Sequence, residues 1–85
     1  MSALTDYVER ENAFAALFGS KPLDLNNEVD RQKIANRIDS ALSPENLTCD
    51  GELSASQVRA RYKALTKAAA ELQKIDPSVT FYEFA

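Results

Sequence analysis

The chain has no histidine, no tryptophan, one cysteine and two glycines among its 85 residues. Without an imidazole, no histidine base is present to activate Cys49 or a serine, and no Cys/His set is present to bind zinc. Pairs of carboxylates remain, but a domain this small rarely encloses the pocket needed to desolvate them. The two glycines, Gly19 and Gly51, stand far apart, which excludes a glycine-rich phosphate-binding loop. These absences predict a protein that is not an enzyme and that has no metal site and no cofactor.

Long apolar runs and paired cysteines are also missing. No stretch approaches the roughly 18 apolar residues that a membrane span requires, and acids occupy the N-terminal region where a secretory signal would carry lysines. Cys49 has no partner for an internal disulfide, which suits a reducing compartment. We therefore expect a cytoplasmic protein without membrane contact, folded as one domain over residues 1–85.

The feature that is present throughout is helical periodicity. It predicts an all-α domain of three helices at about residues 2–18, 27–42 and 54–75, with a short helical turn near 44–48. The predicted buried face of the first helix consists of Leu4, Val8, Ala15 and Phe18, widened by Tyr7, Phe14 and Leu17. That of the second consists of Val29, Ile34, Ile38, Ala41 and Leu42. In the linker between them, Leu23 and Leu25 are expected to reach the core.

The third helix carries an apolar seam at alternating steps of four and three residues: Val58, Tyr62, Leu65, Ala69 and Leu72. A seam of this kind is typical of a coiled coil, but it lasts only about two heptads, fewer than a freestanding coiled coil needs. Packing onto the first two helices is therefore the favoured interpretation. A structural homodimer through this seam or through the C-terminal residues is the alternative.

The same helix concentrates positive charge on an acidic chain of net charge −3. Between Ser54 and Ile75 the only acid is Glu71, whereas there are five bases: Arg59, Arg61, Lys63, Lys67 and Lys74. At 100° per residue, all of these bases except Arg61 fall within about 80° of one another and away from the apolar seam. We expect these four side chains to form a solvent-facing stripe, which is either plain surface or a docking site for an acidic protein or a nucleic acid.

The last residues, Ser78 to Ala85, form an aromatic tail that contains Phe81, Tyr82 and Phe84. Because exposed aromatic clusters are costly, this tail is expected either to fold back onto the helices or to dock on a partner or a second copy.

One segment, Asn46 to Gln57, resembles the outline of an EF-hand calcium loop. Asn46, Thr48 and Asp50 stand at the first three ligand positions, and Gly51 at the glycine position. Calcium prefers several carboxylates and a final bidentate glutamate, yet Asp50 is the only carboxylate at a position that binds through its side chain, and Gln57 comes last. The same residues are better interpreted as a turn followed by a helix cap, in which Ser54 and Gln57 have capping-box spacing.

A second resemblance involves the third helix. Residues 53–65 resemble the third helix of Myb/SANT-type helix-turn-helix domains, with Gln57, Val58, Arg61, Tyr62 and Leu65 at the pattern positions. The family's spaced tryptophans are absent. The resemblance implies that this helix enters the major groove of DNA, with Arg59, Lys63 and Lys67 reaching the nucleic acid.

The sequence therefore favours a non-catalytic regulator or adaptor that binds a protein partner, expected to be acidic. The predicted binding residues are the basic stripe of Arg59, Lys63, Lys67 and Lys74 and the aromatic residues Phe81, Tyr82 and Phe84. A small DNA-binding regulator of helix-turn-helix type is the first alternative, and a structural homodimer is the second.

Overall fold

The structure, a computed structural model that describes residues 2–84, is helical. It contains four helices, α1 (Ala3–Ala16), α2 (Glu28–Ala41), α3 (Pro44–Leu47) and α4 (Ala55–Ile75). The predicted all-α class is confirmed, and the three long helices lie within the predicted bounds to one or two residues.

Each long helix begins at a polar side chain that accepts backbone N–H groups of the first turn. Ser2 accepts from the backbone of Thr5, and Asn27 accepts from Val29 and Asp30. Ser54 and Gln57 form the predicted capping box at the start of α4. These caps satisfy N–H groups that have no partner within the helix, which fixes where each helix starts.

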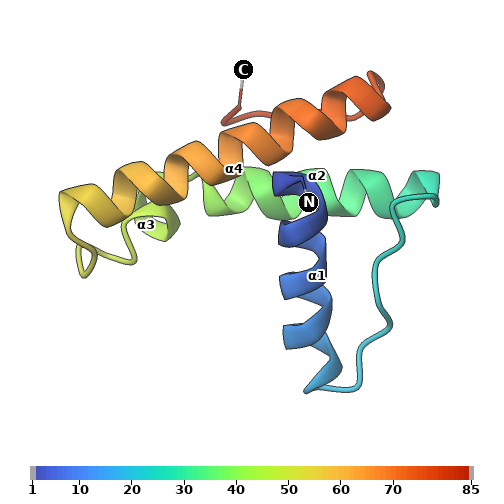
Figure 1. Ribbon diagram of the computed structural model, residues 1–85, viewed down its shortest axis with the longest axis horizontal. Helices are drawn as coiled ribbons and strands as arrows, with labels where there is room; N and C mark the ends of the chain where they lie inside the picture. Colours follow the sequence, from blue (N-terminus) through green and yellow to red (C-terminus); the bar gives the residue numbers. More distant parts are fainter. Residues whose placement is uncertain (1, 85) are drawn as a thin grey trace.

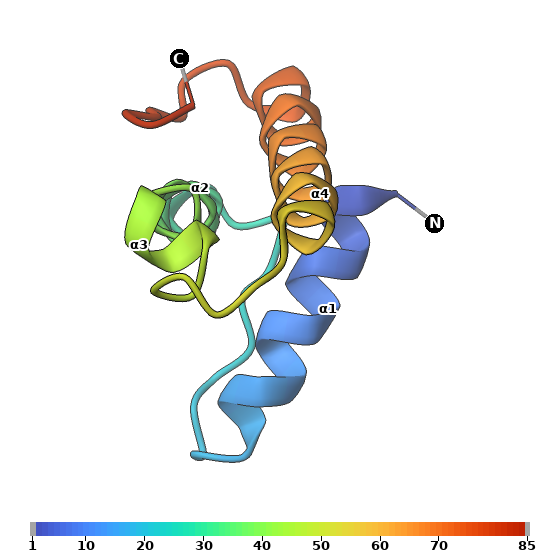
Figure 2. The same ribbon diagram turned by 90° about the vertical axis from the view of Figure 1, so that its left-hand side faces the viewer.

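The helices pack in two directions. α2 and α4 lie side by side, while α1 crosses them steeply and its C-terminal half projects away from them (Figure 1). The short helix α3 lies at the turn between α2 and α4, and the chain after α4 passes over to α2, as the second view shows (Figure 2). The fold is therefore a pair of helices with a third helix attached across it by one end.

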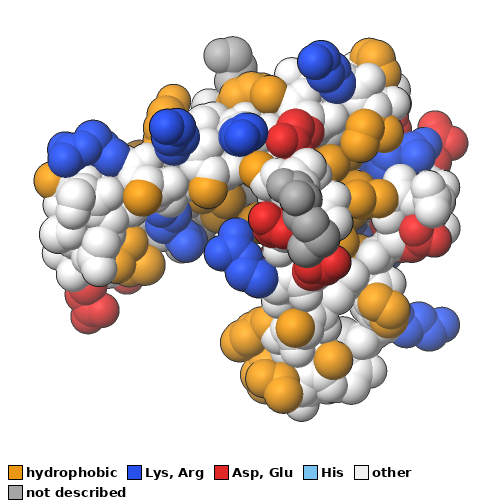
Figure 3. All heavy atoms as spheres, in the orientation of Figure 1, with side chains coloured by type: hydrophobic (Ala, Val, Ile, Leu, Met, Phe, Trp, Pro, Cys, Tyr) orange, Lys and Arg blue, Asp and Glu red, His pale blue; other side chains and the backbone are white. Residues whose placement is uncertain are grey.

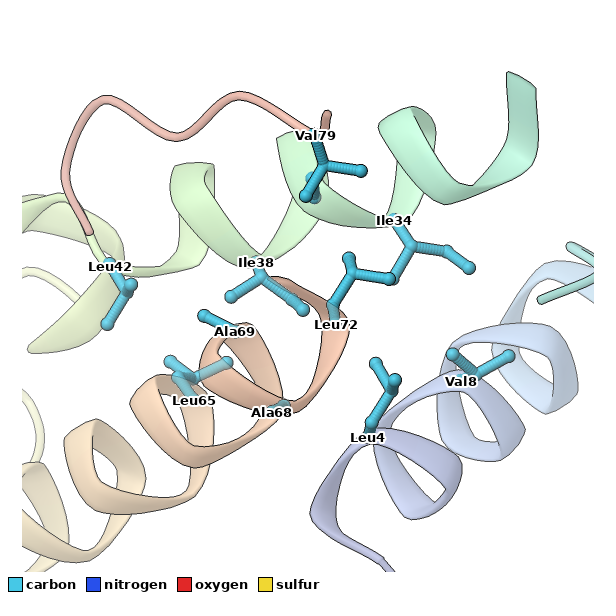
Figure 4. Packing of buried hydrophobic residues seen from close by; sticks show 11 residues of the cluster. Leu4, Val8, Ile34, Ile38, Leu42, Leu65, Ala68, Ala69, Leu72 and Val79 are labelled. Carbon is cyan, nitrogen blue, oxygen red and sulfur yellow. The ribbon is translucent and has the colours of Figure 1, made fainter. Parts of the chain in front are cut away.

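The core lies where the three long helices meet (Figure 4). Its fully buried large side chains are Leu4 of α1, Ile34 and Ile38 of α2 and Leu72 of α4. Ala68 and Ala69 are also buried, and their small size lets the neighbouring helices approach α4 closely. Truncating one of the large residues to alanine typically costs about 2–5 kcal/mol, so this junction holds the fold together.

The apolar seam of α4 faces this intramolecular core. Leu65, Ala69 and Leu72 are buried, whereas Tyr62 remains 53% exposed. Packing of the seam onto the chain's own helices is thus confirmed for its C-terminal part.

The predicted buried face of α1 is wrong at its C-terminal end. Leu4 and Val8 are buried, but Phe14, Leu17 and Phe18 are 63%, 78% and 71% exposed. The reason is the steep crossing, because only the first turns of α1 reach the other helices. Val29, also predicted as buried, is 65% exposed because it lies in the first turn of α2, beyond the helix junction.

The linker between α1 and α2 is tied to α1 by one side chain. The Asn12 amide donates to the carbonyl of Leu23 at 3.0 Å and accepts from its N–H at 2.8 Å. Leu23 and Leu25 are partly buried against the core, as predicted. The projecting end of α1 is therefore held by its own linker, and its large apolar side chains remain exposed.

Candidate functional site

The four predicted cations Arg59, Lys63, Lys67 and Lys74, here called the basic row, are all exposed on α4. Lys and Arg side chains follow the upper edge of the molecule along this helix (Figure 3). Within residues 2–84, the ion pairs are Arg31–Asp76, Lys33–Asp30 and Arg37–Glu11, and none includes a member of the row. The positive charge of the row is therefore not neutralised by an ion pair within the described chain.

The one acid of α4, Glu71, is engaged elsewhere. Its carboxylate accepts the backbone N–H of Leu4 at 2.9 Å. This hydrogen bond is the main cause that lowers the pKa of Glu71, and the nearby Lys67 lowers it further. Glu71 thus holds the start of α1 through its ionised carboxylate.

Arg61 lies apart from the row and is partly buried. Its Nε is buried and has no hydrogen-bond partner within residues 2–84. The helical angle of Arg61 separates it from the predicted stripe, and the sequence does not predict it as a site residue. The signal that could have found it is the same angle, because Arg61 shares the inward-facing side of α4 with Leu65 and Leu72.

Arg61 borders a groove of about 490 Å³ between α1 and α4. Ala60, Ala64 and Leu65 of α4 and Ala41 of α2 provide apolar lining, and α1 contributes polar and aromatic lining. A second hollow of about 570 Å³ shares Glu11, Ala41 and Arg61 with the groove and extends to Phe14 and α3. The two hollows therefore adjoin at these three residues, and together they are called the depression.

Two charged side chains of α1, Arg10 and Glu11, line the groove, and they differ in whether they form an ion pair. Glu11 pairs with Arg37 at 3.6 Å between their side chains, whereas Arg10 has no ion pair within the described residues. Burial raises the pKa of Tyr7, and repulsion by the Glu11 carboxylate raises it further. The phenol therefore stays neutral, and Arg10 and Arg61 contribute positive charge that no ion pair offsets.

The aromatic tail folds back onto α2. The buried Asp39 carboxylate accepts three consecutive backbone N–H groups: Tyr82 at 2.8 Å, Glu83 at 2.8 Å and Phe84 at 3.1 Å. Phe81 and Phe84 pack against the core with their rings edge to face, whereas Tyr82 is 80% exposed. Self-docking, one of the two predicted alternatives, is what the structure has, so Tyr82 is the tail aromatic that is most open to a partner.

The segment that resembles a calcium loop forms helix and turn. Asn46 lies in α3 and donates to the carbonyl of Ser40 at 2.8 Å, and Thr48 donates to the carbonyl of Pro44 at 2.7 Å. Asp50 and Gly51 adopt left-handed backbone conformations that turn the chain toward α4. Within residues 2–84, no three His, Cys, Asp or Glu side chains gather in a way that would hold a metal ion.

Among the described residues, no helix combines the length and the apolar character required to cross a membrane. Comparison of the chain with protein families, with curated proteins and with solved structures found no match.

Proposed function

We propose that the protein is a non-catalytic regulator or adaptor that binds an acidic protein partner through the basic row of α4. The observation that carries this proposal is that four exposed cations share one face of a single helix and none is ion-paired within residues 2–84. Leu65, Ala69 and Leu72 fix that helix to the core, so the row is presented rigidly. A preorganised charged face loses little entropy when it binds.

The row alone supports binding of modest strength. Exposed charge pairs contribute roughly 0–1 kcal/mol each, and charges at the rim of an interface mainly raise the association rate. Tyr82 is the tail residue that is free to add apolar contact, because Phe81 and Phe84 pack against the core. A specific partner therefore needs a further apolar surface on this protein.

A nucleic acid is the alternative partner. The exposure of Arg59, Lys63 and Lys67 on one face of α4 supports it, together with the resemblance of residues 53–65 to a Myb/SANT third helix. The two functions differ in one measurable respect. Binding to DNA weakens steeply as salt is added, by counterion release, and a protein-docking face does not bind DNA at physiological salt.

The test is affinity capture from the native host with the wild-type chain and with Arg59→Glu/Lys63→Glu. Each lysate is divided, and one half is treated with nuclease. The control, Lys21→Glu/Lys33→Glu, has the same net charge but reverses two exposed lysines outside the row. We expect the row variant to lose a nuclease-resistant partner that the control retains.

Loss of a nuclease-sensitive partner would instead establish the DNA-binding alternative. Retention of every partner by the row variant would refute the role of the basic row. The homodimer alternative is tested separately by sedimentation of the wild-type chain, which we expect to behave as a monomer at tens of micromolar.

A further inference from the structure

We propose that the groove between α1 and α4 receives an acidic amphipathic helix of the partner, and that Arg61 binds one carboxylate of that helix. This inference rests on the proposed function and deepens it, because it names the segment of the partner and the surface that supplies apolar contact. It involves residues outside the basic row.

The shape of the groove suits a helix. Ala60 and Ala64 are exposed and lie one turn apart on α4, so the side of the groove formed by α4 has no large side chains there. Small residues at this spacing let a second helix approach the backbone closely. A groove about 490 Å³ in volume, open to solvent and adjoining the second hollow, accommodates a row of side chains from one helical face.

The α1 side of the groove offers apolar anchors. Tyr7 lines the groove and Phe14 lines the adjoining hollow, and both fall on one side of α1. The Phe14 and Phe18 rings contact each other with their centroids 5.3 Å apart and remain exposed. Apolar side chains gather at this projecting end of the molecule (Figure 3). An exposed aromatic cluster beside a groove is typical of a protein-binding site.

The charge around the groove identifies an acidic occupant. Arg10 and Arg61 line it and form no ion pair within the described part of the chain, and Glu11 is already paired with Arg37. Lys63 and Lys67 of the basic row lie within about 100° of Ala60 and Ala64 on the α4 helical wheel, so cations flank the groove on its outer side as well. Two further acids, Glu45 and Asp50, line only the part of the depression near α3. The carboxylates of the occupant are therefore expected over Arg10 and Arg61 and away from α3.

Arg61 provides the specific contact. Its Nε is buried, has no acceptor within residues 2–84, and belongs to a side chain that lines both hollows. A buried donor without an acceptor is uncommon in folded proteins. Because that Nε is buried, an occupant of the groove reaches Arg61 at its terminal nitrogens. The two terminal nitrogens of a guanidinium form a planar edge that binds a carboxylate through two parallel hydrogen bonds. A glutamate or aspartate of the docked helix would bind Arg61 in this way and offset its positive charge.

The direct test uses a displayed library of random 16-residue peptides, selected on the full-length protein. We expect the enriched peptides to carry apolar residues at helical spacing and at least one acid, and to bind at least tenfold more weakly when that acid is changed to its amide. In an NMR titration of the protein, their chemical-shift changes should centre on Ala60, Ala64 and Tyr7. Enrichment of neutral or basic peptides, or shifts centred elsewhere, would overturn the proposal.

Two substitutions of exposed alanines provide a matched pair. Ala64→Glu places a carboxylate in the groove, where it repels an acidic peptide and competes for Arg61, and should weaken binding of the selected peptides at least tenfold. Ala16→Glu makes the same change on α1, at an exposed position that lines neither hollow and lies away from the basic row, and should leave binding within about twofold. Equal effects of the two substitutions would show that only net charge matters. Because both alanines are exposed, neither substitution disturbs the core.

Arg61→Gln tests the anchor itself and should weaken acidic peptides at least tenfold while changing their amide versions little. If Arg61→Gln unfolds the protein, the Ala64/Ala16 pair decides the question. If Arg59→Glu/Lys63→Glu loses the native partner while Ala64→Glu retains it, the proposed function stands and the groove is not its binding site. If the chain sediments as a dimer that Phe18→Ser dissociates, a second copy covers this surface and the proposal is wrong.

Discussion

Two regions of the protein each carry a pair of phenylalanines, the C-terminal tail and the end of α1, and they differ in burial. In the tail, the Phe81 and Phe84 rings lie 5.3 Å apart and pack against the core. At the end of α1, the Phe14 and Phe18 rings are also 5.3 Å apart, yet both side chains are mostly exposed. Apolar content does not distinguish the two regions, because each has two phenylalanines no more than four residues apart in the sequence.

The difference lies in polar anchors. The backbone of the tail is bound by Asp39, and its first residues are fixed by Asp76, which accepts from the backbone and hydroxyl of Ser78 and from Arg31. The end of α1 has no such attachment to another helix among its described hydrogen bonds, apart from the brace between Asn12 and the linker. Buried carboxylates thus decide which aromatic pair docks and which remains available to a partner.

Low pH should have the largest effect, because it weakens the parts of the fold that carboxylates hold and leaves the end of α1 unaffected. Hydrogen bonds from Leu4 lower the pKa of Glu71, and hydrogen bonds from Ser78 and then Arg31 lower that of Asp76, from ordinary values of 4.5 and 3.8. Both groups therefore stabilise the fold fully above those ordinary values, and their contributions are lost as the pH falls below them through the lowered folded-state values. Urea unfolding between about pH 7 and pH 2 should show stability falling below about pH 4.5.

Glu71→Gln is the control for the acid effect. It should flatten the part of the pH dependence that comes from the start of α1, while the slope due to Asp76 remains. An unchanged slope would mean that the Glu71 contact with Leu4 does not form in solution. The protection factors of the Leu17 and Phe18 amides, which correct exchange rates for their intrinsic pH dependence, should change least with acid, because no described carboxylate holds that end.

Replacing the anchor of the tail should have the next largest effect. Asp39→Ala removes the acceptor of three N–H groups and frees Phe81 and Phe84 from the core. Each hydrogen bond to a charged group contributes about 1.5–3 kcal/mol, and three are lost here, so we expect the unfolding free energy to fall by at least about 3 kcal/mol. Urea denaturation measures the loss, and hydrogen exchange should show Tyr82, Glu83 and Phe84 unprotected. Asp6→Ala, an exposed acid in the first turn of α1, should cost less than about 1 kcal/mol.

The sequence predicted the helices well because their signals are local. Ser54 and Gln57 at capping-box spacing, Asn27 ahead of α2, and the recurrence of Leu65, Ala69 and Leu72 each depend on residues within one or two turns. The exposure of the basic row also follows from helical angle alone. These features are set by the periodicity of one helix and do not require knowledge of how the helices cross.

The groove and the anchoring of the tail could not be predicted in the same way. Asp39 lies 43 residues from Tyr82, and nothing near Asp39 in the sequence marks it as an acceptor for the tail. The exposure of Phe14 and Phe18 depends on the steep crossing of α1, which its own amphipathic pattern does not encode. The helical angle of Arg61 indicates that it faces inward, but the groove that it lines becomes apparent only when α1 and α2 are placed beside it.

A smaller effect is expected from a matched pair of phenylalanine truncations. Phe81→Ala removes a half-buried ring and its edge contact with Phe84, which should lower the unfolding free energy by about 1–2 kcal/mol. Phe18→Ala removes an exposed ring at the end of α1 and should change stability by no more than about 0.5 kcal/mol. Thermal or urea unfolding of the two variants under one buffer gives the comparison. Equal losses would show that the end of α1 packs against the fold in solution.

The smallest effect on global stability is expected at Gly19, which ends α1 with φ of 72°. In this left-handed conformation the N–H of Ser20 reaches the carbonyl of Ala15 at 3.1 Å, and a methyl group at Gly19 would meet no atom within 4 Å. Gly19→Ala therefore introduces conformational strain of about 1 kcal/mol and no clash. Because no hydrogen bond or ion pair within residues 2–84 joins this end of α1 to another helix, the strain should be relieved by local fraying. We expect the amides of Leu17, Phe18 and the substituted residue 19 to exchange faster. The unfolding free energy measured in urea should change by less than about 0.5 kcal/mol. A full loss of about 1 kcal/mol in urea would mean that this end unfolds only with the core, and that its exposed aromatic residues belong to the same cooperative unit as the docked tail.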